Sequence, residues 1–115
     1  MQSAHLSTTF QKIYDFCKHL YENLKRIPKR DRYTWGKRIE DIALHVLTLA
    51  AHAQYLPKYK KKSVLQELSL QIDLIKIFLR PGNDLRILDD ATYLKRSGEV
   101  IEMGKMTGKW LQSQQ

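Results

Sequence analysis

The sequence predicts an all-α protein, an antiparallel up-down-up-down four-helix bundle in one domain that spans residues 1–115. Three observations support this. Apolar residues recur at the helical period in four blocks, no block shows sustained two-residue alternation, and the connections between blocks are short. A chain of 115 residues is long enough for one hydrophobic core and little more. The expected helices cover about residues 8–27, 31–55, 59–80 and 89–112.

The first helix is predicted from an apolar stripe at three- and four-residue spacing. Thr8 and Gln11 have the spacing of a capping box at its start. Pro28 is expected to end the helix, because the residue before a proline is pushed out of helical geometry. The stripe consists of Phe10, Ile13, Tyr14, Cys17, Leu20, Tyr21, Leu24 and Ile27.

Capping residues and helix breakers predict the bounds of the other three helices. Asp31 is the expected N-cap of the second helix. Pro81 and Gly82 are expected to stop the third helix, since proline removes a backbone donor and clashes with the preceding turn. Asp89 is the expected N-cap of the fourth helix, which then runs to the end of the apolar pattern.

The third helix carries a second apolar row in addition to its core stripe. The row consists of Leu70, Leu74, Ile77 and Phe78. A helix that is apolar most of the way round is usually buried on more than one side. The row therefore predicts an interface between subunits of a homo-oligomer. The alternative is a monomer with a loosely packed core.

The positive charge is concentrated in the first half of the chain. The net charge is +8, residues 1–62 hold 13 Lys and Arg against 5 Asp and Glu, and residues 63–115 hold 7 of each. Such an excess favours a polyanionic partner. One cluster is predicted to bind nucleic acid, together with two residues that an antiparallel bundle brings to the same end: Lys25, Arg26, Lys29, Arg30, Arg32, Lys37 and Arg38, with Lys76 and Arg80. A possible second basic patch lies at the opposite end: Lys58, Lys60, Lys61 and Lys62.

Aromatic residues lie among both clusters of positive charge. Tyr33 and Trp35 accompany the first cluster, and Tyr55 and Tyr59 accompany the second. Rings among cations are typical of surfaces that neutralise phosphates and stack bases. The alternative is a solvated helix end beside aromatic core residues. For Trp35, which lies on the apolar stripe, the core is favoured.

No catalytic, metal or cofactor site is expected. No Glu has a His three residues later, as di-iron bundles require, and there is no Gly-rich phosphate loop or HExxH motif. Asp41, His45 and His52 share one helical face but have no carboxylate cluster facing them. We interpret these histidines as structural or surface residues. The chain is therefore predicted not to be an enzyme.

Cysteine usage and hydropathy favour a cytoplasmic protein. Cys17 is the only cysteine, so no intrachain disulfide forms, which fits a reducing compartment. No apolar run reaches the about 20 residues that cross a bilayer. The polar stretch Met1–Thr9 lacks the apolar core of a signal peptide. We expect no membrane partner.

Three stretches resemble the accessory variability determinant (Avd) family of diversity-generating retroelements. Residues 32–44 read RYTWGKRIEDIAL and are similar to the family's second-helix pattern R-F/Y-T-L-G-x-R-I-E-D-A-A-L. Residues 104–111 read GKMTGKWL and resemble its ending, G-K/R-x-L/T-G-x-W-L. Residues 75–80 read IKIFLR and are similar to its third-helix L-R-F-L-L-R. The similarity extends from about Phe10 to Ser113.

The resemblance implies four-helix bundles assembled into a basic homopentameric barrel. It also implies a non-enzymatic partner of the retroelement reverse transcriptase that binds RNA or DNA and supports mutagenic cDNA synthesis. The chain departs from the family pattern at Trp35, where leucine is usual, and at Pro81 and Gly82, where the helix usually continues. The alternative is a structural or ribosome-associated bundle, since the motifs extend into a wider group that includes proteins encoded by 23S rRNA intervening sequences.

Overall fold

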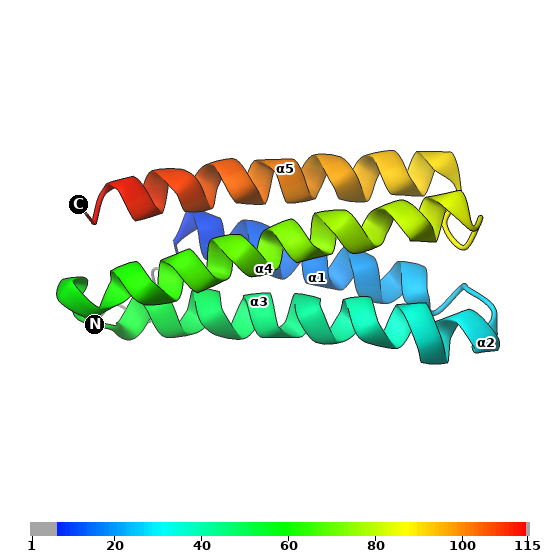
Figure 1. Ribbon diagram of the computed structural model, residues 1–115, viewed down its shortest axis with the longest axis horizontal. Coiled ribbons are helices and arrows are strands. Elements are labelled where there is room, and N and C mark those ends of the chain that lie inside the picture. The colour runs from blue at the N-terminus through cyan, green and yellow to red at the C-terminus, as the bar shows by residue number, and fades with distance from the viewer. Residues whose placement is uncertain (1–6, 115) are drawn as a thin grey trace.

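The computed structural model describes residues 7–114, in which helices joined by short connections are present and no strand is found. Its four long helices are α1 (Thr8–Leu24), α3 (Lys37–Tyr55), α4 (Lys58–Asp84) and α5 (Asp90–Gln112). They lie side by side along the 43 Å axis of a molecule that measures 24 and 21 Å across (Figure 1). The predicted all-α four-helix fold is therefore confirmed. The polar segment Met1–Leu6 lies outside the described residues.

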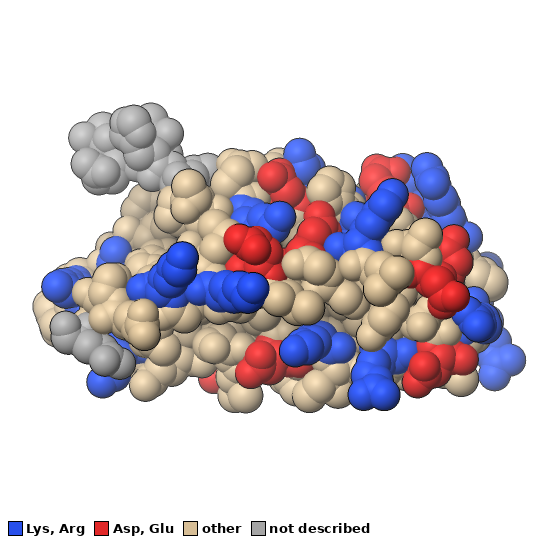
Figure 2. Space-filling model, turned by 90° about the horizontal axis from the view of Figure 1, so that it is seen from above, with Lys and Arg blue, Asp and Glu red and all other residues tan. Residues whose placement is uncertain are grey.

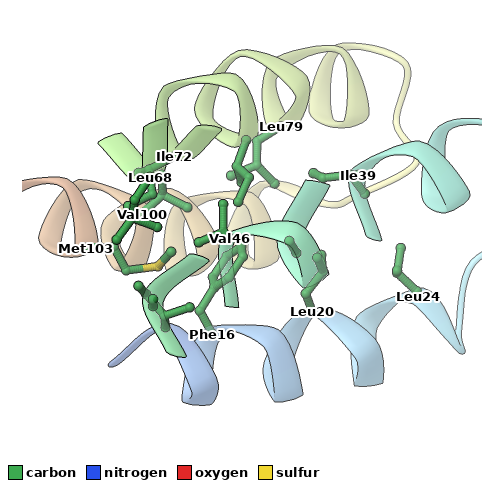
Figure 3. Close-up of a cluster of buried hydrophobic side chains, with 14 of the residues drawn as sticks. Phe16, Leu20, Leu24, Ile39, Val46, Leu68, Ile72, Leu79, Val100 and Met103 are labelled. Atoms are coloured by element: carbon green, nitrogen blue, oxygen red, sulfur yellow. The ribbon is translucent and has the colours of Figure 1, made fainter. Parts of the chain in front are cut away.

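The helices enclose one hydrophobic core. Helix α1 packs on α3 and α5, and α4 packs on the same two helices, so each helix contacts two neighbours. Phe16, Val46, Ile72 and Val100 represent the four helices in the buried cluster (Figure 3). Each fully buried side chain of this kind contributes about 1.5–3 kcal/mol relative to exposure. The predicted stripe of the first helix is buried at Ile13, Leu20 and Leu24, but Tyr14 and Tyr21, which were predicted to lie on it, are 41% and 56% exposed.

Helix α1 begins at residue 8 as predicted, but its N-cap is Ser7 rather than Thr8 and it ends earlier than the sequence suggested. Ser7 is its N-cap, and the hydroxyl of this residue accepts from the backbone N–H of Phe10 at 3.0 Å. The helix ends at Leu24 rather than at residue 27, because the last backbone bonds tighten to three-residue spacing before Pro28. Ile27 still reaches the core from the connecting turn.

The second helix begins with a π turn that sequence analysis did not predict. A short helix, α2 (Lys29–Asp31), is followed directly by the π-helical segment η1 (Arg32–Gly36) and then by α3. Asp31 is helical and is not the N-cap; Pro28 occupies that position. Proline suits a helix start because its φ is preset and its missing N–H would have no partner there.

Helix α4 continues through Pro81, so the prediction that Pro81 and Gly82 stop it is wrong. The Pro81 carbonyl accepts from the N–H of Leu85 at 2.9 Å, and the helix ends at Asp84. Arg86 then adopts a left-handed φ of 62°, with Ile87 N–H donating to the Gly82 carbonyl and Arg86 N–H to that of Asn83. This is a Schellman ending, in which Arg86 takes the position that glycine usually fills.

Gly82 serves packing rather than helix termination. A Cβ on Gly82 would lie 2.3 Å from Cζ2 of the Trp35 ring. The Trp35 indole N–H donates to the Phe78 carbonyl of the same helix at 2.8 Å. The two departures from the family pattern are therefore one structural feature, because the absent side chain at Gly82 makes room for the large one at Trp35. The predicted core position of Trp35 agrees with this packing of its ring against α4.

Asp89 caps α5 as predicted. Its carboxylate accepts from the backbone N–H of Thr92 at 2.8 Å, and this hydrogen bond holds the pKa of Asp89 below its usual value. Deeper in the same helix, the buried Arg96 pairs with Glu99 at 3.0 Å and donates to Asn23 of α1 at 3.3 Å. The charge of Arg96 is thus neutralised inside the bundle and does not add to the basic surface.

Candidate nucleic-acid interface

The first basic cluster gathers at one end of the bundle. Lys25 and Arg26 follow α1, Lys29 and Arg30 lie in α2, Arg32 lies in η1, and Lys37 and Arg38 begin α3. All seven side chains are exposed. This is the end where Figure 1 labels α2, and Figure 2 shows Lys and Arg side chains projecting from it with Asp and Glu among them.

The π turn brings the start of α3 close to the end of α1. A Cβ on Gly36 would lie 3.2 Å from Cδ1 of Ile27 and 3.3 Å from the Asp31 carbonyl oxygen, so glycine permits a tight approach there. The Thr34 hydroxyl donates to the Arg30 carbonyl at 2.9 Å. These contacts hold cations from two helices around one hollow.

That hollow, which we call the α1–η1 hollow, measures about 160 Å³ and is several times larger than the about 30 Å³ share of one liquid water. Its rim is both aromatic and basic, with one carboxylate. It is lined by Tyr21, Leu24, Lys25, Arg32, Tyr33, Gly36, Lys37 and Glu40. The site can accept a group larger than water among three cations.

A second, wider hollow adjoins the first between α3 and α4. Tyr33 and Lys37 line both hollows, so these two side chains lie at their junction. We call this the α3–α4 hollow, and its lining is completed by Thr34, Arg38, Asp41, Ile42, His45 and Gln71. The nearby Trp35 is half-buried against α4 and offers no comparable exposed ring.

A third hollow adds Arg86, which was not among the predicted contacts. Arg26 and Arg86 line it together, with Asn23 of α1 and the α4–α5 connection completing the wall. Arg86 is exposed, and its guanidinium lies 3.0 Å from the carboxylate of Asp90. The signal that could have located Arg86 is its place in a connection at the basic end of an antiparallel bundle.

Ion pairs separate the cluster into neutralised and available cations. Lys25 pairs with Glu22 at 3.4 Å, and Lys37 pairs with Asp41 at 2.8 Å. The hydrogen bond to Asp41 raises the pKa of Lys37, so this lysine stays charged. Within residues 7–114, no carboxylate lies within 4.0 Å of five other cations of the cluster: Arg26, Lys29, Arg30, Arg32 and Arg38. These five are the stronger candidates for phosphate contacts.

Lys76 and Arg80 are exposed on α4. Arg80 lies within the stretch from Phe78 to Gly82 that contacts Trp35, so it belongs to the same end of the bundle as the π turn. Lys76 lies one turn farther from that end. Neither residue lines one of the three hollows, so the fold brings both near the cluster without placing them in its walls.

The possible second basic patch lies in the first turns of α4, at the opposite end of the bundle. Lys61 lies over the Trp110 ring of α5 at 5.8 Å, and Lys60 lies over the Tyr59 ring at 5.8 Å. Lys58 and Lys62 are exposed, and Tyr59 is 81% exposed. The first of these contacts joins α4 to α5, and the second lies between neighbouring residues of α4.

The second apolar row of the third predicted helix is only partly covered. Leu70 and Ile77 are 55% and 61% exposed, whereas Leu74 is half-buried and Phe78 packs partly against the core. The monomer therefore does not absorb the whole row. The predicted oligomer interface stays a prediction.

Groups that could perform chemistry are sparse in residues 7–114. No group of three or more His, Cys, Asp or Glu side chains is arranged to hold a metal ion there. Burial raises the pKa of the Cys17 thiol to about 11, and this thiol lies 3.5 Å from the Ala43 carbonyl oxygen. No helix in the described part of the chain has the length and hydropathy of a membrane span.

These features define a basic four-helix bundle whose exposed arginines gather around a π turn. A comparison with family models identifies the particular class. The bAvd-like family matches residues 7–114, nearly the whole chain, so the chain belongs to the bAvd-like family. No curated protein and no solved structure matches the chain.

Proposed function

We propose that this chain is a cytoplasmic, non-enzymatic accessory protein of a diversity-generating retroelement. It binds nucleic acid and the reverse transcriptase to support mutagenic cDNA synthesis, and the polymerase supplies the chemistry. Membership of the bAvd-like family supports the accessory role. The observation that carries nucleic-acid binding is the set of exposed cations without carboxylate partners at one end: Arg26, Lys29, Arg30, Arg32 and Arg38.

The contacts are made chiefly to phosphates and have little sequence preference. Exposed arginines match phosphate geometry with two parallel donors, and they release counterions when they bind. No recognition helix of a helix-turn-helix or zinc finger is identified in the sequence to read base edges. The partner is therefore selected by its charge and its shape.

Salt dependence of binding tests this interface. Replacing Arg26, Lys29, Arg30 and Arg32 by glutamine should reduce the slope of log K against log salt by about 3–4 on duplex DNA, because each lost phosphate contact contributes about 0.9. Fluorescence anisotropy at several salt concentrations measures the slope. The matched control replaces Lys18, Lys95, Lys105 and Lys109, which lie on α1 and α5 and remove the same charge.

The control keeps the parent slope if the cluster is the interface. Equal slopes for both variants would show that binding depends on net charge alone, as for a structural or ribosome-associated bundle. Far-UV helicity should be unchanged in both variants, because exposed surface substitutions rarely change stability by more than about 0.5 kcal/mol.

The same proposal includes assembly into a homopentamer through the row on α4. Leu70 and Ile77 are exposed apolar residues of this row, and a subunit interface would remove them from water. Replacing both by aspartate should convert the oligomer to monomer, measured by light scattering after gel filtration. Leu44, which is 51% exposed on α3, provides the control substitution. A monomeric parent protein at micromolar concentration would contradict the assembly.

A further inference from the structure

We infer that the basic end is a site for single-stranded nucleic acid, in which Tyr33 stacks an unpaired base at the junction of the two hollows. This inference rests on the proposed nucleic-acid binding and names its ligand class. Tyr33 is 66% exposed. Since a large ring gains by leaving water, an exposed ring held among cations favours a planar ligand.

In the π turn, Tyr33 and Trp35 have different surroundings. Trp35 points into the bundle, where its indole N–H bonds to the Phe78 carbonyl, and Gly36 is buried against Ile27. Both contacts anchor the turn to α4 and α1. Tyr33 lies in this anchored segment with its ring in solvent, so its position is set by the packing of the residues that follow it.

Cations line both hollows that meet at Tyr33, and we infer that they bind the phosphates on either side of the stacked base. Arg32 and Lys25 line the α1–η1 hollow, Arg38 lines the α3–α4 hollow, and Lys37 lines both. A strand that passes from one hollow to the other crosses Tyr33. Its phosphates meet cations on each side while one base covers the ring.

A second tyrosine extends the platform. Tyr21 of α1 is 56% exposed and lines the α1–η1 hollow with Tyr33. Lys25 already lies 5.8 Å above the Tyr21 ring, so a base there would have to displace it. Tyr33 has no such cation over it among the described residues, and we assign it the primary stacking role.

Duplex nucleic acid does not expose the base faces that would stack on Tyr33. In a duplex the base faces are stacked on one another, and only phosphates and groove edges reach the protein. Unpaired bases can stack on aromatic side chains, and every base has a face to offer. The site therefore distinguishes single strands from duplexes without reading sequence.

The test compares Tyr33→Ala with the parent on three ligands of equal length: an oligothymidine, an abasic strand and a blunt duplex. Tyr33→Ala should weaken oligothymidine binding by about 5- to 100-fold, the usual range for one stacked base. Binding to the abasic strand and the duplex should change less than about twofold, because stacking contributes nothing there. Tyr33→Phe should keep the parent affinity.

Tyr14→Ala is the matched control, since Tyr14 is also exposed and has a lysine over its ring but lies on α1, outside both basic clusters. It should leave oligothymidine binding unchanged. An equal loss on all three ligands, or no loss with Tyr33→Ala, overturns the stacking site. Absence of nucleic-acid binding by the parent overturns the proposed function itself, so the two failures are distinguishable.

Discussion

The two ends of the bundle are both basic, but they are built differently. At the end with the π turn, five of the seven cluster cations line hollows, and four of the seven are arginines. At the opposite end, four lysines follow one another closely at the start of α4. Arginine presents a planar fork suited to phosphate, whereas lysine is a strongly hydrated point charge. The first end is therefore suited to shape-dependent binding and the second to general attraction.

Packing also differs between the ends. The π turn needs two glycines in close contact with neighbouring side chains, Gly36 against Ile27 and Gly82 against Trp35. Toward the opposite end of α5, Gly108 has no neighbouring atom within 4 Å of an added Cβ. Gly36 and Gly82 therefore tolerate little change, whereas an added side chain at Gly108 meets open space.

The largest effect is expected at the seat of Trp35. Gly82→Ala should lower the free energy of unfolding by about 1–3 kcal/mol, because the new Cβ overlaps the indole ring and overpacking has costs of this size. Urea denaturation followed by circular dichroism measures the change. Gly108→Ala is the control, and it should raise stability by up to about 1 kcal/mol, the difference in helix propensity.

Combining Gly82→Ala with Trp35→Leu shows whether the two residues are coupled. If the indole causes the clash, Gly82→Ala becomes neutral or stabilising once leucine replaces it, giving a coupling energy of about 0.5–3 kcal/mol. Additive effects would contradict the packing that we describe. They would also mean that the two departures from the family pattern are independent.

A smaller effect is expected from exchanging arginine for lysine at the basic end. Replacing Arg26, Arg30, Arg32 and Arg38 by lysine keeps the charge but removes the paired donors, and affinity for nucleic acid should fall about tenfold. The salt slope should stay within about one unit of the parent slope, since the number of charges is the same. Anisotropy titration measures both quantities.

Replacing lysine by arginine at the opposite end tests whether the two ends differ as binding sites. Replacing Lys58, Lys60, Lys61 and Lys62 by arginine should increase affinity less than about threefold if that end only attracts polyanions, because these lysines line none of the hollows described above. A tenfold gain would show that both ends are equivalent binding sites. The distinction between a built site and a diffuse patch would then fail.

The sequence predicts which cations gather at the basic end, but not how their side chains are arranged there. Lys25 to Arg38 form a dense run in the sequence, and an antiparallel bundle places Arg80 and Arg86 at the same end. The ion pairs of Lys25 with Glu22 and of Lys37 with Asp41 have local helical spacing that the sequence already shows. The outward position of Tyr33, which lies in the π-helical segment, depends on the π turn. A π turn inserts one extra residue per turn, and no periodicity signal in so short a segment reveals it.

The sequence by itself determined the helical class, the four long helices, the Asp89 cap and the asymmetry of charge, because periodicity, capping chemistry and charge are local properties. Only the tertiary structure decided that α4 passes through Pro81. The helix continues because hydrogen bonds after Pro81 are kept, the Schellman motif at Arg86 ends the helix, and Trp35 packs on Gly82. These contacts form only in the packed bundle, so the local preference of proline against helix interiors does not predict them.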